Sequence, residues 1–223
     1  MSKIKQNHQN LLLKIKRTHQ LSLYKNTTQP KLIAVSKKQS VEKILEAINC
    51  GQKIFGENRI QESDKKWRPI LKEYKDLELH LIGPLQSNKV KLALDIFDVI
   101  HSLDRESLAF AISKNIKKKI KTKSFFIQVN TGKEKQKSGI FPEHLEDFYL
   151  LCTKKFHIPI QGLMCIPPVN EEPSIHFSYL NKLCKKLNLK SLSMGMSNDY
   201  REAIKFGATH IRVGTSFFGE RIA

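Results

Sequence analysis

Short apolar runs alternate with helical segments along almost the whole of this 223-residue chain, with no composition break or linker between them. Apolar runs rich in β-branched residues are typical of parallel strands that are buried on both faces. Eight such strands alternating with helices predict a single-domain (β/α)8 barrel of the TIM type over residues 1–223, rather than an open doubly wound sheet. The predicted strands are 32–35, 54–58, 79–83, 98–103, 125–130, 158–166, 191–196 and 210–218.

The predicted helices leave one irregularity in this pattern. An extra amphipathic helix at 3–24 precedes the first strand, and no helix is predicted after the eighth strand. Because each strand of such a barrel is normally followed by an outer helix, we expect the N-terminal helix to cover the gap in the ring. The other helices are predicted at 41–49, 62–74, 88–96, 106–118, 142–154, 174–187 and 199–206.

The formal charge of +18 raises the question of a nucleic-acid partner. Lysine far outnumbers arginine, however, and Lys, Ile and Asn are abundant throughout, as a coding bias toward A and T would also produce. The densest run, 117–123, falls where a helix should end and a strand begin, where lysines interact with the helix dipole and water. We therefore interpret the charge as solvated surface and do not expect a nucleic-acid partner, although a polyanionic partner stays open.

The sequence has no feature of a secreted or membrane protein. Its start carries lysines without the apolar segment of a secretory signal, and no stretch approaches the roughly 20 apolar residues of a membrane span. We therefore expect a cytoplasmic protein without membrane contact. The cysteines are widely spaced and form no C-x-x-C pair, so we expect reduced, mostly buried thiols and no metal site; they are Cys50, Cys152, Cys165 and Cys184.

A lysine lies at the end of the first predicted strand, in the sequence Ala34-Val35-Ser36-Lys37. Most lysines are solvated, and taken alone Lys37 would be interpreted in that way. At the end of a buried strand, apolar walls and neighbouring cations would lower its pKa. A neutral Lys37 would then be a nucleophile able to form a Schiff base with an aldehyde.

Several residues at the carboxyl ends of the other predicted strands suit a phosphorylated ligand. Active sites of such barrels lie at this end, often with a phosphate bound after strands seven and eight. Each residue has an ordinary alternative, such as a turn glycine or a helix N-cap, but together with Lys37 they predict a pocket for pyridoxal 5'-phosphate. No glycine-rich nucleotide-binding turn is found. The candidates are Asn58, Ser197, Arg212, Gly214 and Thr215.

The chain resembles the pyridoxal phosphate homeostasis protein family, single-domain barrels related to the N-terminal half of alanine racemase. The resemblance extends over nearly the whole sequence, and its motifs are 34–37, 55–58, 82–89, 128–130, 137–139, 162–167, 192–197 and 212–215. It implies that Lys37 carries the cofactor, that Ser197, Gly214 and Thr215 hold its phosphate, and that Arg212 faces the pyridine nitrogen. The main departure is Lys38-Gln39-Ser40, where the family has Thr-Lys-Pro.

An arginine beside the pyridine nitrogen bears on the expected function. A guanidinium cannot accept a proton and leaves the ring neutral, which makes the cofactor a weak carbanion stabiliser. The racemase also uses a second domain, for which no room remains after the eighth strand. We therefore expect a monomeric carrier that takes part in cofactor homeostasis and supplies apoenzymes, with no catalytic residue. The alternatives are a small cofactor-dependent enzyme such as an amino-acid racemase, and a nucleic-acid-binding barrel.

Overall fold

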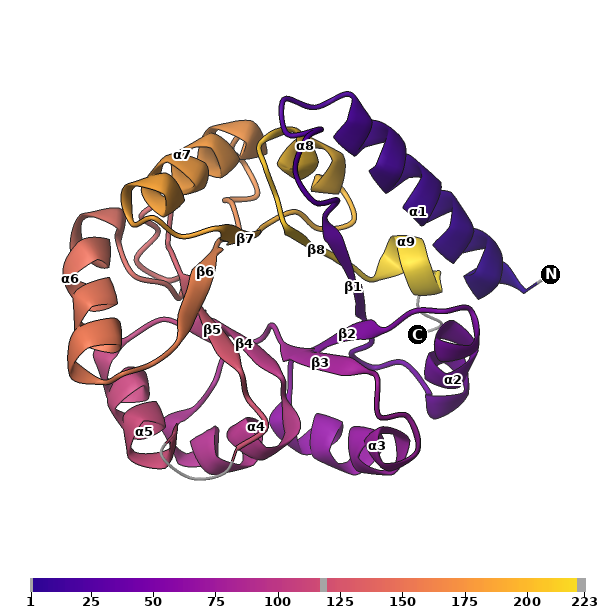
Figure 1. Ribbon diagram of the computed structural model, residues 1–223, viewed down its shortest axis with the longest axis horizontal. Coiled ribbons are helices and arrows are strands. Elements are labelled where there is room, and N and C mark those ends of the chain that lie inside the picture. Colours follow the sequence, from indigo (N-terminus) through magenta and orange to yellow (C-terminus); the bar gives the residue numbers. More distant parts are fainter. Residues whose placement is uncertain (1, 117–119, 220–223) are drawn as a thin grey trace.

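The fold is a closed barrel of eight parallel strands that follow one another in chain order, in a computed structural model that describes residues 2–116 and 120–219 (Figure 1). The last strand pairs with the first, so that Lys31 lies opposite His210 and Ala34 opposite Val213. The predicted TIM-type barrel is therefore confirmed. Its strands are β1 (Lys31–Val35), β2 (Ile54–Glu57), β3 (Glu78–Leu81), β4 (Val99–Leu103), β5 (Ser124–Gln128), β6 (Ile160–Met164), β7 (Ser191–Ser193) and β8 (His210–Val213).

Helices surround the barrel between successive strands (Figure 1). The α2 helix illustrates why they form, because Ser40 caps its N-terminus by accepting a hydrogen bond from the Lys43 N–H, and Ile44 and Ile48 are buried on one face. The α-helices between the strands are α2 (Val41–Asn49), α3 (Ile60–Glu73), α4 (Val90–Ile96), α5 (Glu106–Ile116), α6 (Leu145–Leu150), α7 (Pro173–Lys186) and α8 (Tyr200–Lys205). There are also two short 3-10 helices, η1 (Ser87–Lys89) and η2 (Pro142–His144), and a π-helical segment that continues α6, η3 (Leu151–Lys155).

The predicted eighth strand is too long, and the prediction that no helix follows it is wrong. The β8 strand ends at Val213, and Thr215–Phe218 form a one-turn helix, α9. The β-propensity of this segment is overridden by packing, since Phe217 and Phe218 are buried and the Phe217 ring lies 5.3 Å from the ring of His8.

The N-terminal helix completes the outer ring together with α9. This helix, α1 (Lys3–Gln20), packs against α9, α8 and α2 (Figure 1). Leu11 and Ile15 are buried on its inner face, and the Asn7 side chain donates a hydrogen bond to the carbonyl of Phe217. The expectation that α1 covers the gap is confirmed, although the helix ends at Gln20 rather than near residue 24.

Predictions were also made for the burial of the cysteines and for the lysine run at 117–123. All four cysteines are free and three are buried, and burial raises the pKa of both Cys152 and Cys165 to about 12. The prediction of mostly buried thiols is confirmed, with Cys50 partly exposed. The lysine run at 117–123 and the end of the predicted helix at 106–118 lie partly outside the described residues. Within the described part, Lys121 pairs with Asp98 at 2.9 Å.

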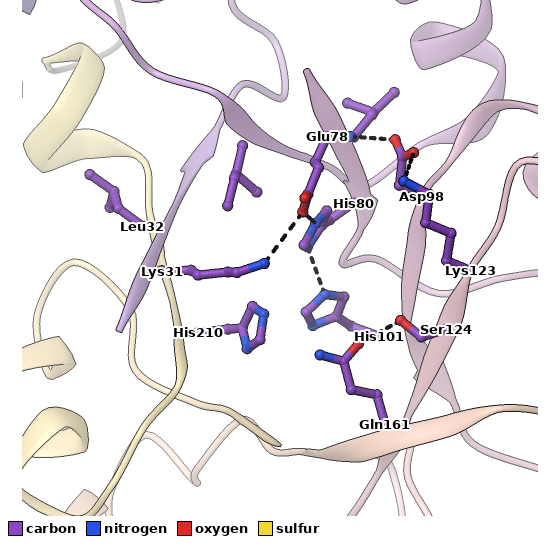
Figure 2. A network of polar contacts seen from close by, with 12 residues as sticks. Lys31, Leu32, Glu78, His80, Asp98, His101, Lys123, Ser124, Gln161 and His210 are labelled. Carbon is purple, nitrogen blue, oxygen red and sulfur yellow. Dashed lines mark hydrogen bonds and ion pairs between the residues drawn. The ribbon is translucent and has the colours of Figure 1, made fainter. Parts of the chain in front are cut away.

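Histidines lie inside the barrel, where branched apolar side chains are usual. His80 of β3, His101 of β4 and His210 of β8 are buried, and their rings lie 5.1 to 6.2 Å apart (Figure 2). The Phe126 ring stacks on the His101 ring, with 4.4 Å between the ring centroids. Burial lowers the pKa of all three histidines, that of His210 to about 3, so the interior holds neutral imidazoles.

These histidines should make the fold sensitive to acid. Below pH 6.5, the ordinary pKa of histidine, the unfolded chain takes up protons that the folded barrel excludes. The free energy of unfolding should therefore fall with falling pH by up to roughly 1.4 kcal/mol per pH unit for each histidine. Urea unfolding between pH 7 and about 5 measures the slope. It should be lower in His210→Leu, and a stability independent of pH in this range would contradict the analysis.

Candidate functional site

The predicted site residues lie at the carboxyl ends of four strands that are neighbours in the barrel. Because β7, β8, β1 and β2 are adjacent, the loops that follow them share one rim. A Cβ on Gly214 would lie 3.5 Å from the Cβ of Val35, which places the end of β8 beside the turn that carries Lys37. The residues on this rim are Lys37, Asn58, Ser197, Gly214 and Thr215, and Arg212 lies just below it within β8.

The turn that carries Lys37 is held on both sides by α3. The carbonyl of Ser36 accepts a hydrogen bond from Lys66 Nζ at 2.9 Å, and the N–H of Lys38 donates to Glu62 Oε1 at 2.9 Å. Lys66 and Glu62 also pair with each other at 3.3 Å. Lys38 has a φ of +59°, which turns the chain sharply directly after Lys37. The backbone of Lys37 is therefore fixed between two anchored neighbours, and its side chain is partly buried.

A buried carboxylate underlies this turn. Glu57, at the end of β2, has no exposed side-chain surface, and its Oε1 lies 2.7 Å from Lys66 Nζ. The same oxygen accepts hydrogen bonds from Ser36 Oγ at 2.7 Å and from the indole N–H of Trp67 at 2.9 Å. Removing one partner of such a buried pair costs roughly 3–5 kcal/mol, because the other charge is left uncompensated. The pair thus ties β1, β2 and α3 together beneath the rim.

Asn58 follows Glu57 and presents a free acceptor. Its Oδ1 is buried and has no hydrogen-bond partner within the described residues. The backbone of Asn58 is in close contact with Gly83, where an added Cβ would lie only 2.4 Å from the Asn58 carbonyl oxygen. A buried amide oxygen without a partner carries a desolvation cost that a ligand's donor could remove.

Ser197 and Gly214 meet between the loops after β7 and β8. The backbone N–H of Gly214 donates to Ser197 Oγ at 3.3 Å, and Thr215 follows at the first position of α9. The Ser197 loop is formed by Gly195, whose φ is +90°, and by Asp199, which accepts a hydrogen bond from the Met196 N–H at 2.5 Å. A hydroxyl beside backbone N–H groups is suited to binding an anion.

Arg212 lies in β8, and its guanidinium reaches across to two other strands. Nη1 donates to Ser193 Oγ at 2.7 Å, and Nη2 donates to the Cys165 carbonyl at 2.9 Å. Ser193 is the last residue of β7, and Cys165 directly follows β6. Burial lowers the pKa of Arg212, while Cys165 and Asp199 oppose that shift. An arginine nevertheless keeps its charge in proteins, so the barrel carries a fixed cation below the rim.

The sequence did not indicate the residues that position the predicted ones. Glu57, Lys66 and Ser193 were not predicted as site residues, because the sequence alone does not show which side chains of different strands and helices meet. Glu57 had one usable signal, a charged residue within an otherwise apolar strand, which must be paired if it is buried. Among the described residues, no group of three or more His, Cys, Asp or Glu side chains could hold a metal ion.

Comparison with known proteins gives one consistent result. Residues 16–222 match the family model described as alanine racemase, N-terminal domain. A pyridoxal phosphate homeostasis protein of Aquifex aeolicus is 42% identical over 200 residues, which are 86% of this chain and 87% of the relative. The homologous protein of Vibrio cholerae, which has the same name, is 39% identical over 231 residues, 99% of this chain and 98% of the relative.

Solved structures agree with these relatives. PipY of Synechococcus elongatus, determined without pyridoxal phosphate, has a TM-score of 0.85 and 32% identity, with 97% of this chain and 100% of PipY covered. PipY with pyridoxal phosphate bound has a TM-score of 0.77 and 34% identity, covering 91% of this chain and 99% of PipY. The expected resemblance is confirmed: the chain belongs to the pyridoxal phosphate homeostasis protein family and has the alanine racemase N-terminal domain fold.

Proposed function

We propose that this protein binds pyridoxal 5'-phosphate reversibly as a Schiff base on Lys37 and takes part in its homeostasis as a carrier. The observation that carries the proposal is the convergence of an amine, an anion site and a guanidinium on the adjacent ends of β7, β8 and β1. When bound, the cofactor supplies an aldehyde, a phosphate and a ring nitrogen. The rim offers a partner for each of these groups.

The phosphate would bind where the loops after β7 and β8 meet. The N–H of Gly214 donates to Ser197 Oγ at 3.3 Å, so the serine can direct its own hydrogen to a phosphate, and the N–H would exchange its bond to the serine for one to the anion. Thr215 adds a hydroxyl at the start of α9. Gly214 has no side chain to obstruct the approach of an anion to the backbone. This arrangement supports the assignment of Ser197, Gly214 and Thr215 as the phosphate-binding residues.

The aldehyde would react with the amine of Lys37. The turn that carries this amine is held by Lys66 and Glu62, which limits where it can reach. Lys66 Nζ also donates to the Ser36 carbonyl directly before Lys37, which fixes the backbone from which the amine extends. Asn58 would offer its unpaired Oδ1 to a donor of the ligand.

Arg212 would limit how strongly the site activates the cofactor. Of its five N–H donors, two bind Ser193 and Cys165, so others remain to face a ligand's ring nitrogen. A guanidinium donates to that nitrogen and cannot take a proton from it. The ring then stays unprotonated, which weakens its ability to stabilise a carbanion at a bound amino acid. A site of this kind retains the cofactor without activating it strongly.

The wider role follows from reversible binding. A Schiff base that forms and hydrolyses readily would limit free aldehyde and release cofactor to apoenzymes that depend on it. The relatives named as homeostasis proteins support this role. We also propose that the protein acts as a monomer in the cytoplasm. Among the described residues, no helix is both long enough and apolar enough to cross a membrane.

Lys37→Ala should abolish covalent attachment of pyridoxal phosphate. The absorption band of the Schiff base should disappear, and borohydride followed by peptide mass analysis should find no modified lysine. Two matched controls should leave the band intact. Lys38→Asn removes the neighbouring amine in a residue type that tolerates a positive φ, and Lys137→Ala removes an ammonium that pairs with Glu134 at 2.6 Å. An unchanged band in Lys37→Ala would refute the assignment.

Ser197→Ala should weaken binding of pyridoxal phosphate selectively. A hydrogen bond to a charged group is worth roughly 1.5–3 kcal/mol, so the dissociation constant should rise about ten-fold or more. Pyridoxal, which lacks the phosphate, should bind the variant and the native protein alike. Asn198→Ala, at the exposed neighbouring position, serves as control. Equal losses for the two ligands would show that Ser197 does not contact the phosphate.

Amino-acid racemisation should be nearly undetectable. The native protein is incubated with pyridoxal phosphate and L-alanine in deuterated water, and both α-deuterium exchange and D-alanine are followed. Slow exchange without inversion is expected, since Lys37 is the only well-placed base that we identify on the described rim. Formation of D-alanine on the order of 1 per second or faster would instead establish a racemase.

A further inference from the structure

A continuous column of hydrogen bonds passes through the barrel and ends on Arg212. It begins at Glu78, the first residue of β3, whose Oε2 lies 3.3 Å from His80 Nε2 (Figure 2). His80 Nδ1 lies 3.0 Å from His101 Nε2, and His101 Nδ1 lies 2.8 Å from Ser193 Oγ. Ser193 Oγ accepts the bond from Arg212 Nη1 at 2.7 Å. We define these five residues as the polar column.

The chemistry of the two end groups fixes the direction of every bond in the polar column. Arg212 can only donate, and burial keeps both imidazoles neutral. Only the arrangement in which Ser193 accepts from Arg212 and directs its own hydrogen to His101 Nδ1 then leaves a proton on the His80 nitrogen that faces Glu78. His101 must then carry its proton on Nε2 and donate to His80 Nδ1. His80 in turn donates from Nε2 to the Glu78 carboxylate, which can only accept. Both histidines are therefore neutral Nε2–H tautomers, and the bonds run one way from cation to anion.

The surroundings of the polar column support these protonation states. Burial lowers the pKa of His80, although Glu78 and Asp98 oppose this, and it lowers that of His101 further, assisted by His80, His210 and Arg212. Glu78, at the end of the polar column, is ionised at neutral pH, because its hydrogen bond with His80 lowers the pKa of the carboxyl group to about 2. Lys31 of β1 lies 3.7 Å from the same carboxylate and supports its charge at the amino end of the barrel.

We propose that His101 and His80 are positioning residues that, through Ser193, hold the Arg212 guanidinium in one orientation toward the ring nitrogen of the cofactor. The inference rests on the proposed function only for the identity of that ligand. A serine hydroxyl that lacks a fixed acceptor can rotate, and an arginine side chain has many rotamers. Each successive bond also polarises the next, so the orientation at one end of the polar column depends on the other.

The geometry of the column is tested first in ligand-free protein by nitrogen-15 NMR. His80 and His101 should both show a protonated Nε2 and an unprotonated Nδ1 at neutral pH. The Nη groups of Arg212 should give separate signals, because rotation of a held guanidinium is slow. Protonation of Nδ1 in either histidine, or averaged Nη signals in native protein, would overturn the proposal.

Substitutions at His80 then test action at a distance. His80→Leu removes the acceptor for His101, whereas the Oδ1 of His80→Asn lies near the position of Nδ1 and can still accept. His210→Leu is the matched control, because His210 is equally buried and its ring contacts the same imidazoles, yet its hydrogen bond is to Thr209 at 2.8 Å. Of these three variants, only His80→Leu should let the Arg212 guanidinium rotate, so that its separate Nη signals merge. Identical behaviour of His80→Leu and His210→Leu would overturn the proposal.

Titration with pyridoxal phosphate supplies the second readout. His80→Leu should shift the absorption maximum of the bound cofactor and weaken its binding roughly three- to ten-fold. This is the loss of affinity expected when one hydrogen bond to the cofactor is no longer well oriented. His80→Asn should restore both toward native values. A spectrum and affinity unchanged in His80→Leu would overturn the positioning role. Failure of native protein to bind the cofactor would refute the proposed function, whereas the Arg212 signals in ligand-free protein would still decide whether the polar column orients the guanidinium.

Discussion

The pairing of β8 with β1 is the constraint on which the rest of the molecule depends. It brings together residues from the two ends of the chain, with Ile33 opposite Arg212 and Ala34 opposite Val213. Without that pairing the amine of Lys37 and the proposed anion site at Ser197 and Gly214 would lie on separate segments. Closure of the barrel and assembly of the candidate site are therefore a single event, governed by the same backbone hydrogen bonds.

Much of the fold could be predicted from the sequence, because buried parallel strands are apolar in a way that needs no tertiary information. All eight strands were located, and Lys37 lies just beyond the end of β1, whereas Asn58, predicted as the last residue of the second strand, directly follows β2. The segment 214–218 was mispredicted because its phenylalanines favour a strand locally, while their burial against α1 favours a helical turn. The local β-propensity of a segment does not reflect its contact with a helix about two hundred residues away in the chain.

The supporting contacts of the site were beyond prediction for a related reason. The side chains that point into a barrel are set by strand register, and the sequence does not give the register between strands. His80, His101 and Ser193 therefore looked like isolated polar residues in three strands. The pairing of Glu57 with Lys66 likewise joins β2 to α3, and only the structure places Ser36 and Trp67 on the same oxygen.

The packing of α1 against α9 has a consequence for how the protein folds. The α1 helix packs against α9 and β1 pairs with β8, although the other strands of the barrel lie between these partners in the sequence. Contacts between such distant residues make folding slow and leave apolar strand edges exposed meanwhile. Until β8 has paired with β1, the loops of the candidate site are not brought together, so a partly folded chain has no assembled site. The candidate site therefore exists only in molecules whose barrel has closed.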